Sequence, residues 1–294
     1  MTGETMEVST LVPAEFREMI ATFMAPGEPA VHVAHVEDRV IANDVPVRIY
    51  RPAGDGPFGC LLFLHGSGWV IMSVDTHDHE ARALCNRGNV VVVSVDYRLA
   101  PEHKFPAAVE DCWGALEWVV ASAAELDIDP GRLAVGGDSA GGNLAAVLAR
   151  RARDAGGPPI AFQLLVYPVL DARGGHASRI ENKDGPGLTN ELMHWFTDQY
   201  VRAAEDAEDP DVSPLLAESF AGLPPAFVLT AEYDPLRDEG AEYADRLAAA
   251  GVPVTYRLYE GATHGFWQMS RYAPYAQQAL DECGDALRAA IGGS

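Results

Sequence analysis

The sequence contains almost no lysine: Lys104 and Lys183 are the only two in 294 residues. Arginine does not make up the difference, because Lys and Arg together number 21 against 43 Asp and Glu, which gives a net charge of −22 and an isoelectric point near 4.6. Such a surface repels phosphate backbones and anionic lipid headgroups. We therefore expect neither nucleic acid nor a membrane surface among the partners.

Cysteine and long apolar runs are also scarce. The four cysteines lie far apart in apolar segments and lack any C-x-x-C spacing, which predicts buried free thiols in a reducing compartment: Cys60, Cys85, Cys112 and Cys283. No apolar run approaches the ~18 residues of a membrane span. The first ten residues are acidic and polar, whereas a signal peptide is basic and then apolar. The sequence thus predicts a soluble, cytoplasmic protein.

The composition is that of an ordinary globular protein, with 48% hydrophobic and 22% charged residues. A chain of this length buries about 75% of its unfolded surface, so it needs neither disulfides nor metal to build a core. Short apolar runs typical of buried strands alternate with stretches of helical pattern. The predicted strands are 45–50, 60–64, 90–95, 133–135, 162–166, 226–229 and 254–259, and the predicted helices are 13–24, 107–122, 140–152, 239–250 and 275–291. This alternation predicts an α/β fold, a mostly parallel sheet flanked by helices, as a single domain over 1–294.

One stretch, from about 171 to 221, departs from this alternation. It opens with polar, glycine-rich sequence and contains an amphipathic helical pattern at 189–201. We interpret it as an insertion that covers the carboxyl edge of the sheet, where open α/β sheets bind ligands. The predicted cap is built from about 1–45 and 175–221.

A nucleophile is indicated by the G-D-S-A-G run at 137–141, which lies between a predicted strand and a predicted helix. A sharp turn there lifts the Ser139 hydroxyl into the cleft, and larger side chains two residues to either side would collide with neighbouring backbone. The alternatives are a glycine-rich helix entry with a capping serine and a phosphate-binding loop. The second fails because no Gly-Lys-Ser/Thr follows.

A serine nucleophile needs a base, and three histidines follow Ser139 in the chain. His264 lies directly after a predicted strand, whereas His176 and His194 lie in the insertion and are expected at the surface or in a lid. For the acid that orients the base we prefer Asp234, at a strand end before Pro235. Asp238 better fits the first turn of the following helix, as structural support.

An oxyanion hole is indicated by the run H-G-S-G-W at 65–69, which follows the predicted strand 60–64. Small residues let the backbone approach a substrate carbonyl and present its N–H groups. The partner donor would be the N–H of Ala140, the residue after the nucleophile. Taken alone, the run also fits an ordinary glycine turn.

Together these motifs resemble those of the hormone-sensitive-lipase-like group of α/β-hydrolase esterases, the bacterial type IV carboxylesterases. The matching runs, in the order typical of that family, are H-G-S-G-W at 65–69, D-Y-R-L-A-P-E at 96–102, G-D-S-A-G at 137–141, D-P-L-R-D at 234–238 and H-G-F at 264–266. The resemblance implies an eight-stranded sheet, a cap built partly from the N-terminus, and hydrolysis of short-to-medium acyl esters without a cofactor. By motif position it implies oxyanion donors at Ser67, Gly68 and Ala140. Ser67 departs from the usual glycine, which bears on acyl-group preference.

Two lesser signals are open to a plainer interpretation. The run 76–80 holds two histidines beside acids, but positions i and i+2 do not share a helix face, so it fits a helix start capped by Asp75 or Thr76 better than a metal site. Several aromatic residues could line an acyl or alcohol pocket or else pack in the core: Trp69, Trp195, Phe196, Phe266 and Trp267.

The predicted function is a serine carboxylesterase that acts on a small-molecule ester through Ser139, His264 and Asp234, with no metal and no cofactor. Motifs alone leave open an amidase, deacetylase or lactonase on the same triad. A small-molecule receptor of the same fold is less consistent with three intact catalytic residues. A homodimeric assembly is also left open.

Overall fold

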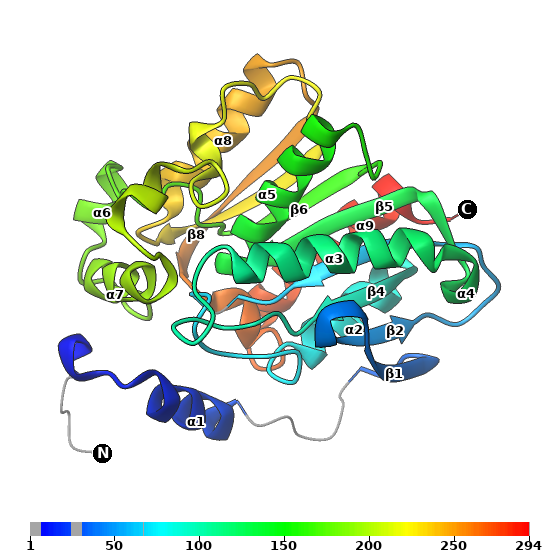
Figure 1. Ribbon diagram of the computed structural model, residues 1–294, viewed down its shortest axis with the longest axis horizontal. Coiled ribbons are helices and arrows are strands. Elements are labelled where there is room, and N and C mark those ends of the chain that lie inside the picture. Colours follow the sequence, from blue (N-terminus) through cyan, green and yellow to red (C-terminus); the bar gives the residue numbers. More distant parts are fainter. Residues whose placement is uncertain (1–6, 25–30, 67, 294) are drawn as a thin grey trace.

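The computed structural model describes residues 7–24, 31–66 and 68–293 (Figure 1). Within these residues eight strands form one sheet in the order β1-β2-β4-β3-β5-β6-β7-β8. The strands are β1 (His35–Val40), β2 (Pro46–Arg51), β3 (Phe58–Leu64), β4 (Val90–Val95), β5 (Ile128–Asp138), β6 (Phe162–Val166), β7 (Ala226–Tyr233) and β8 (Val254–Thr263). β2 pairs antiparallel with β1 and β4, and the remaining neighbours pair in parallel. The predicted mostly parallel α/β sheet is confirmed.

Every residue of β3 and β4 is buried, which explains why these central strands appear in the sequence as predominantly apolar runs. β1 was not predicted, because it is an edge strand that carries Glu37, Asp38 and Arg39 and buries no residue fully. β5 begins five residues before the predicted strand, since its first half is polar and partly exposed.

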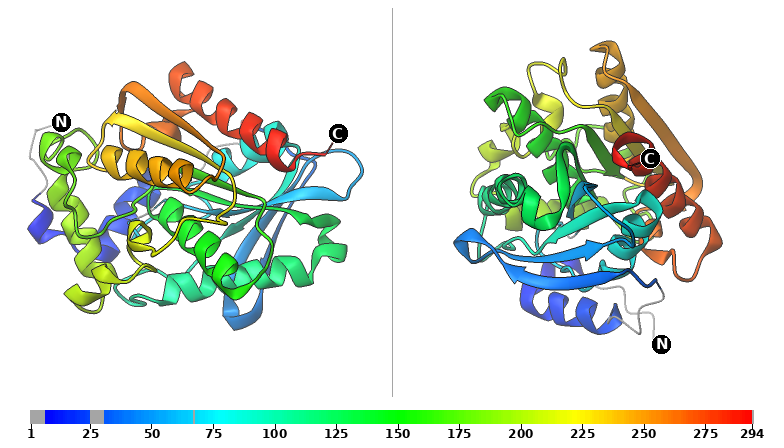
Figure 2. Two further views of the ribbon diagram at one scale, coloured as in Figure 1. Left: turned by 90° about the horizontal axis from the view of Figure 1, so that it is seen from above. Right: turned by 90° about the vertical axis from the view of Figure 1, so that its right-hand side faces the viewer.

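Helices cover both faces of the sheet (Figures 1 and 2). They are α1 (Pro13–Phe23), α2 (Asp78–Gly88), α3 (Ala107–Ala121), α4 (Ala123–Leu126), α5 (Ala140–Ala155), α6 (Ala177–Glu181), α7 (Asn190–Tyr200), α8 (Arg237–Ala249) and α9 (Pro274–Ile291). Short 3₁₀ segments occupy Val8–Thr10, Ala42–Asp44, Ala204–Glu208, Pro214–Leu216 and Phe266–Met269. The expected cap of α2 at Asp75 or Thr76 is wrong: His77 is its N-cap, without a side-chain capping bond.

The sheet separates two apolar cores. Leu62 and Leu64 of β3 face one core, with side chains of α3, α5 and α8, whereas Leu61 and Phe63 face the other, with side chains of α2 and α9. This alternation follows from the two-residue period of a strand. The four cysteines divide between these cores and are all buried and free, as predicted.

The N-terminal helix lies beside the insertion, far from it in sequence. The Phe16 ring of α1 packs edge-on against Trp195 of α7, with ring centroids 6.0 Å apart, and stacks near Phe196 at 6.3 Å. Figure 2 shows α1 and α7 together at one end of the sheet. Among the described residues, no helix combines the length and apolar character that crossing a bilayer requires.

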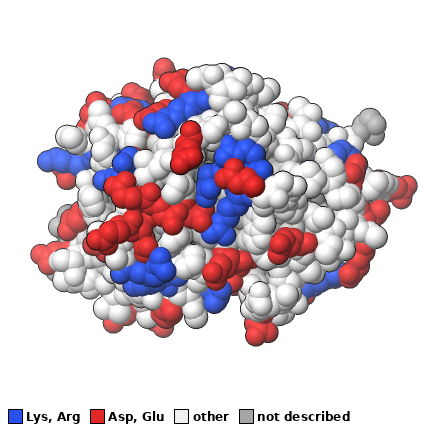
Figure 3. Space-filling model, turned by 45° about the horizontal axis from the view of Figure 1, so that its top comes forward, with Lys and Arg blue, Asp and Glu red and all other residues white. Residues whose placement is uncertain are grey.

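Charged side chains of both signs lie against one another on the face shown in Figure 3. Ion pairs account for much of the arginine in the described residues; Arg48, for example, lies 2.6 Å from Asp38 and 2.8 Å from Asp75. Exposed pairs of this kind contribute only about 0–1 kcal/mol each. These ion pairs neutralise the arginines locally, although the surface as a whole is acidic.

Candidate active site

Ser139 lies in a sharp turn between β5 and α5. Its backbone has φ 54° and ψ −118°, a conformation that costs a non-glycine residue about 1–3 kcal/mol. The Ser139 N–H stabilises the turn by donating to the Val166 carbonyl on β6 at 2.9 Å. Glycine is required on both sides, because a Cβ at Gly137 or Gly141 would lie 2.1 or 1.9 Å from the Leu64 carbonyl oxygen. The expected strand–turn–helix around Ser139 is present.

His264 connects Ser139 to a buried carboxylate. Its Nε2 lies 3.0 Å from Ser139 Oγ, and its Nδ1 lies 2.7 Å from Asp234 Oδ2. Asp234 has no exposed surface, and its Oδ1 accepts the Leu236 N–H at 2.8 Å. An Nδ1–H donated to the carboxylate leaves Nε2 free to accept the Ser139 hydroxyl proton.

These three side chains come from the carboxyl ends of parallel strands. Ser139 follows β5, Asp234 follows β7, and His264 follows β8. Parallel strands end at the same edge of a sheet, so residues up to 125 positions apart meet there. Sequence reasoning chose the same three residues on the same ground.

The structure brings Asp234 rather than Asp238 to His264. Asp238 lies in the first turn of α8, as predicted, and its Oδ2 accepts the Ser178 N–H of α6 at 2.8 Å. The other two histidines lie elsewhere: His176 contacts Glu242 at 2.9 Å, and His194 is exposed on α7.

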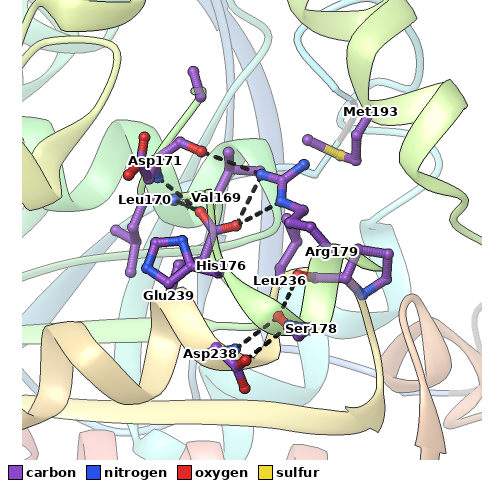
Figure 4. A network of polar contacts seen from close by, with 12 residues as sticks. Val169, Leu170, Asp171, His176, Ser178, Arg179, Met193, Leu236, Asp238 and Glu239 are labelled. Atoms are coloured by element: carbon purple, nitrogen blue, oxygen red, sulfur yellow. Dashed lines mark hydrogen bonds and ion pairs between the residues drawn. The ribbon is translucent and has the colours of Figure 1, made fainter. Parts of the chain in front are cut away.

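Helix α6 of the insertion contacts the start of α8, through Ser178 with Asp238 and Arg179 with Glu239 (Figure 4). The Ser178 hydroxyl donates to the Pro235 carbonyl at 2.7 Å, and Arg179 donates to Glu239 of α8 at 2.8 and 3.1 Å. Both members of this ion pair are buried. Burial raises the pKa of Glu239, against the opposing charge of Arg179. These contacts join the insertion to residues that follow Asp234 closely in the chain.

Ser139 opens into a cavity of about 240 Å³. Its floor includes Ser139, His264, Asp138 and Tyr167. The remaining wall is mostly apolar and comes largely from α1, the segment 187–188 and α7, with lining residues Phe16, Ile20, Leu188, Leu192, Met193 and Phe196. The helix α1 and the segment from 187 to the end of α7 therefore form much of the apolar wall of the cavity.

Of the aromatic residues proposed to line this pocket, only Phe196 does so among the described residues. Trp69 is fully buried and stacks on Tyr200, with centroids 4.3 Å apart and planes at 5°. Trp195 packs behind Phe16, and Phe266 packs against Tyr259 at 5.3 Å. The pocket prediction is wrong for Trp69, Trp195 and Phe266, which stabilise neighbouring elements instead.

The loop after β3 borders the same cavity. Gly66 and Gly68 line it near Ser139, and Ala140 begins α5 immediately after the nucleophile. The N-terminal N–H groups of a helix have no partner within that helix and favour negative charge. Ser67, the third expected donor, lies outside the described residues.

Sequence reasoning missed Tyr167 and Gln268. The Tyr167 ring lies 4.6 Å from the His264 ring, and its backbone has φ 33°. Tyr167 directly follows β6, so the strand-end rule that identified Ser139 could have found it. Gln268 reaches the cavity from the 3₁₀ segment Phe266–Met269, for which no sequence signal stands out.

The 76–80 run has no metal-binding geometry. Among the described residues no three His, Cys, Asp or Glu side chains are grouped to hold an ion. His77 is fully buried and lies 3.2 Å from Asp138, whereas His79 is partly exposed on α2.

Comparison with known proteins agrees with this geometry. A family model described as the alpha/beta hydrolase fold matches residues 61–268. Carboxylesterase NlhH of Mycobacterium tuberculosis is 44% identical over 264 residues, covering 87% of this chain and 83% of the relative. Carboxylic ester hydrolase LipN of the same organism is 45% identical over 270 residues, with coverages of 89% and 72%.

A solved ester hydrolase, EH1AB1 from the metagenome of Lake Arreo, superposes with a TM-score of 0.93 at 42% identity, covering 98% of this chain and 93% of the other. The motif resemblance, the sheet order and these matches agree. The chain belongs to the α/β-hydrolase fold family, in the group of carboxylesterases that resemble hormone-sensitive lipase.

Proposed function

We propose that this carboxylesterase hydrolyses short-to-medium acyl esters through Ser139, His264 and Asp234, by way of an acyl-enzyme. One observation carries the proposal. The Oγ of Ser139, the imidazole of His264 and the carboxylate of Asp234 form a continuous chain of contacts, 3.0 and 2.7 Å long, that opens into an apolar cavity. Contacts of this length allow proton transfer between nucleophile and base.

Acylation begins when Ser139 Oγ attacks the ester carbonyl and its proton passes to His264 Nε2. Asp234 stays ionised, holds the ring in the required tautomer and stabilises the imidazolium. When the tetrahedral intermediate collapses, the carbon–oxygen bond to the alcohol breaks and His264 returns the proton to the leaving alcohol. The acyl group is then bound to Ser139.

Deacylation repeats these steps with water as the nucleophile. His264 Nε2 takes a proton from the water, which attacks the acyl carbon, and returns it to Ser139 Oγ as the acid leaves. Histidine suits both roles because its pKa lies near neutral pH.

The negative oxygen formed in each step needs donors. We assign this role to the N–H groups of Ala140 and Gly68, and by motif position to that of Ser67. Gly68 lines the cavity together with Ser139, and Ala140 directly follows Ser139 at the start of α5. Each donor of this kind typically contributes about 10²–10³ in rate.

The cavity supports small, uncharged substrates. Its volume of about 240 Å³ is below the ~300–1,000 Å³ typical of sites for drug-sized ligands. We assign α1, within residues 1–45, and α6–α7, within 175–221, as the cap, because both α1 and α7 contribute apolar wall. An apolar wall favours acyl chains over charged groups.

Initial rates on p-nitrophenyl acetate, butyrate, octanoate and palmitate test the proposal. Wild type should turn over the shorter esters, and Ser139→Ala should lower kcat by at least about 10⁴-fold. Ser94→Ala, which alters a buried serine of β4 outside the cavity, is the matched control and should retain activity. Wild-type rates no higher than those of Ser139→Ala on every ester would overturn the proposal, and parallel assays on anilides and lactones would then identify the leaving group.

A further inference from the structure

A buried polar cluster borders the cavity at Asp138 and takes no part in the acyl-transfer steps. Its members are His77, Glu80 and Asp138, each at most 2% exposed. They come from two separate regions, the start of α2 and the end of β5. Buried charged groups are costly unless they are paired, so this cluster calls for a physical explanation.

Asp138 receives three contacts in this cluster. Its Oδ1 accepts the backbone N–H of Gly66 at 2.7 Å and lies 3.2 Å from His77 Nε2. Its Oδ2 accepts the side-chain amide of Gln268 at 3.4 Å. One carboxylate therefore joins the loop after β3 to the start of α2 and to the 3₁₀ segment beyond His264.

The contact with Gly66 is close enough to determine the path of the loop. A Cβ at Gly66 would lie 2.2 Å from Asp138 Oδ2, so the carboxylate packs directly on the glycine backbone. Gly66 precedes the peptide groups of residues 67 and 68, two of the assigned oxyanion donors. On the other side, the Tyr97 hydroxyl donates to the His65 carbonyl at 2.7 Å.

Charge stabilises this arrangement. Burial alone would raise the pKa of Asp138, but the neighbouring charge of His77 and the Gly66 N–H hold that pKa below its usual value. Burial would likewise lower the pKa of His77, but Asp138 raises it above the ordinary value. Gln268 also contacts the pair, because its side-chain nitrogen lies 2.7 Å from His77 Nε2. The titratable groups that face the pair include Glu80 from α2, His65 directly after β3 and Tyr167 directly after β6, and burial lowers the pKa of His65 to about 3.

We propose that Asp138, paired with His77, is a positioning residue that fixes the oxyanion loop through the Gly66 N–H. The inference rests on the proposed esterase function and assigns a role to two residues outside the triad. Because Asp138 directly precedes Ser139, the same side chain sets the loop relative to the nucleophile. Correct placement of N–H donors matters most when the oxyanion forms, so the pair should affect the transition state more than substrate binding.

Asp138→Ala removes every contact of the carboxylate, and we expect kcat to fall by about 10²-fold with KM changed less than threefold. Asp138→Asn keeps an acceptor for the Gly66 N–H, so its kcat should fall by only about tenfold. This variant also tests the inference if Asp138→Ala does not fold. His77→Ala should also lose about tenfold. The double variant His77→Ala/Asp138→Asn should lose no more kcat than the worse of the two single variants, because the two residues act as one unit.

The experiment measures kcat and KM on p-nitrophenyl butyrate per active site, with sites counted by titration. It also measures the rate at which a p-nitrophenyl alkylphosphonate inactivates Ser139, since that adduct carries an oxygen in the oxyanion position. The control is Asp211→Asn, which breaks a carboxylate pairing with Arg150 and Arg151 away from the cavity. Its kcat should match wild type.

The inference would be supported if the Asp138 variants lose kcat and the rate of phosphonate inactivation by equal factors. In that case KM and the number of active sites per protein should stay as in wild type. Unchanged kcat per site, or a loss confined to KM or to the count of sites, would overturn it. The phosphonate arm needs no turnover, so an inactive wild type would contradict the proposed function while the phosphonate rates still decide the role of Asp138.

Discussion

Arg17 of the N-terminal helix forms a two-pronged ion pair with Glu102, 85 positions later in the chain, with contacts of 2.9 and 2.7 Å. The same guanidinium donates to the backbone carbonyls of Val70 and Ala100, both at 2.6 Å. One side chain thus docks α1 against the loops that follow β3 and β4. Since α1 also supplies Phe16 and Ile20 to the cavity wall, this docking bears directly on the proposed substrate pocket.

Replacing Arg17 should therefore alter the cavity without touching the reacting groups. For Arg17→Ala we expect kcat/KM on p-nitrophenyl octanoate to fall by about tenfold, and on acetate by less than threefold, because only the longer chain reaches the wall formed by α1. Arg202→Ala, which removes the ion pair of a more exposed arginine with Asp206, is the control. Equal effects on both esters would count against a cap role for α1.

The assignment of Asp234 as the carboxylate that orients His264 can be tested by comparing it with the nearby Asp238. Asp234→Asn should lower kcat by about 10³–10⁴-fold, because the amide favours the wrong tautomer of His264, a magnitude taken from serine hydrolases in general. Asp238→Asn should keep kcat within about threefold and affect mainly stability, since its partners are in α6 and Arg237. Initial rates and thermal unfolding of both variants decide the assignment. A larger kcat loss in Asp238→Asn would reverse it.

We expect Phe196 to limit the length of acyl chain that the cavity accepts, because its ring lines the wall. Phe196→Ala opens the wall beside Ser139, and we expect the ratio of octanoate to acetate rates to rise by about tenfold. Phe220→Ala removes an equally buried ring that packs on Tyr243 away from the cavity. Both substitutions should cost about 3–5 kcal/mol of stability, but only the first should change the ratio. A ratio that changes in both variants would mean that general loosening, rather than the wall, sets chain preference.

Glu80 should make stability depend on pH. Burial raises the pKa of Glu80 to about 7 from an ordinary value of 4.5. Between these values the folded chain holds a proton that the unfolded chain has released, so the free energy of unfolding falls as pH rises from about 4.5 to 7. The free energy of unfolding of Glu80→Gln, measured relative to that of wild type, should therefore rise by up to about 3 kcal/mol between pH 5 and pH 8.

Urea unfolding at both pH values measures this difference. Glu191→Gln, at an exposed position on α7, controls for the general effect of removing one negative charge from an acidic protein. Parallel pH curves for wild type and Glu80→Gln would show that Glu80 does not titrate in this window.

Much of the fold could be predicted because its signals are local. The run of valines in β4 is typical of a strand buried on both faces, and the spacing of glycines around Ser139 reflects a turn in which a Cβ would strike the Leu64 carbonyl. The order of Ser139, Asp234 and His264 at strand ends followed from the same local patterns. β1 escaped prediction because an exposed edge strand has no such pattern.

The sequence by itself thus determined the α/β class, the central strands and the three residues that meet at their ends. Only the tertiary structure decided which aromatic residues line the cavity, since Trp69 and Phe196 are both large and apolar but one stacks on Tyr200 and the other lines the cavity at Ser139. It also decided that Asp138 holds Gly66, 72 positions away. Local pattern reports which way a side chain faces relative to its own strand or helix. Which distant element it meets depends on how the whole chain packs.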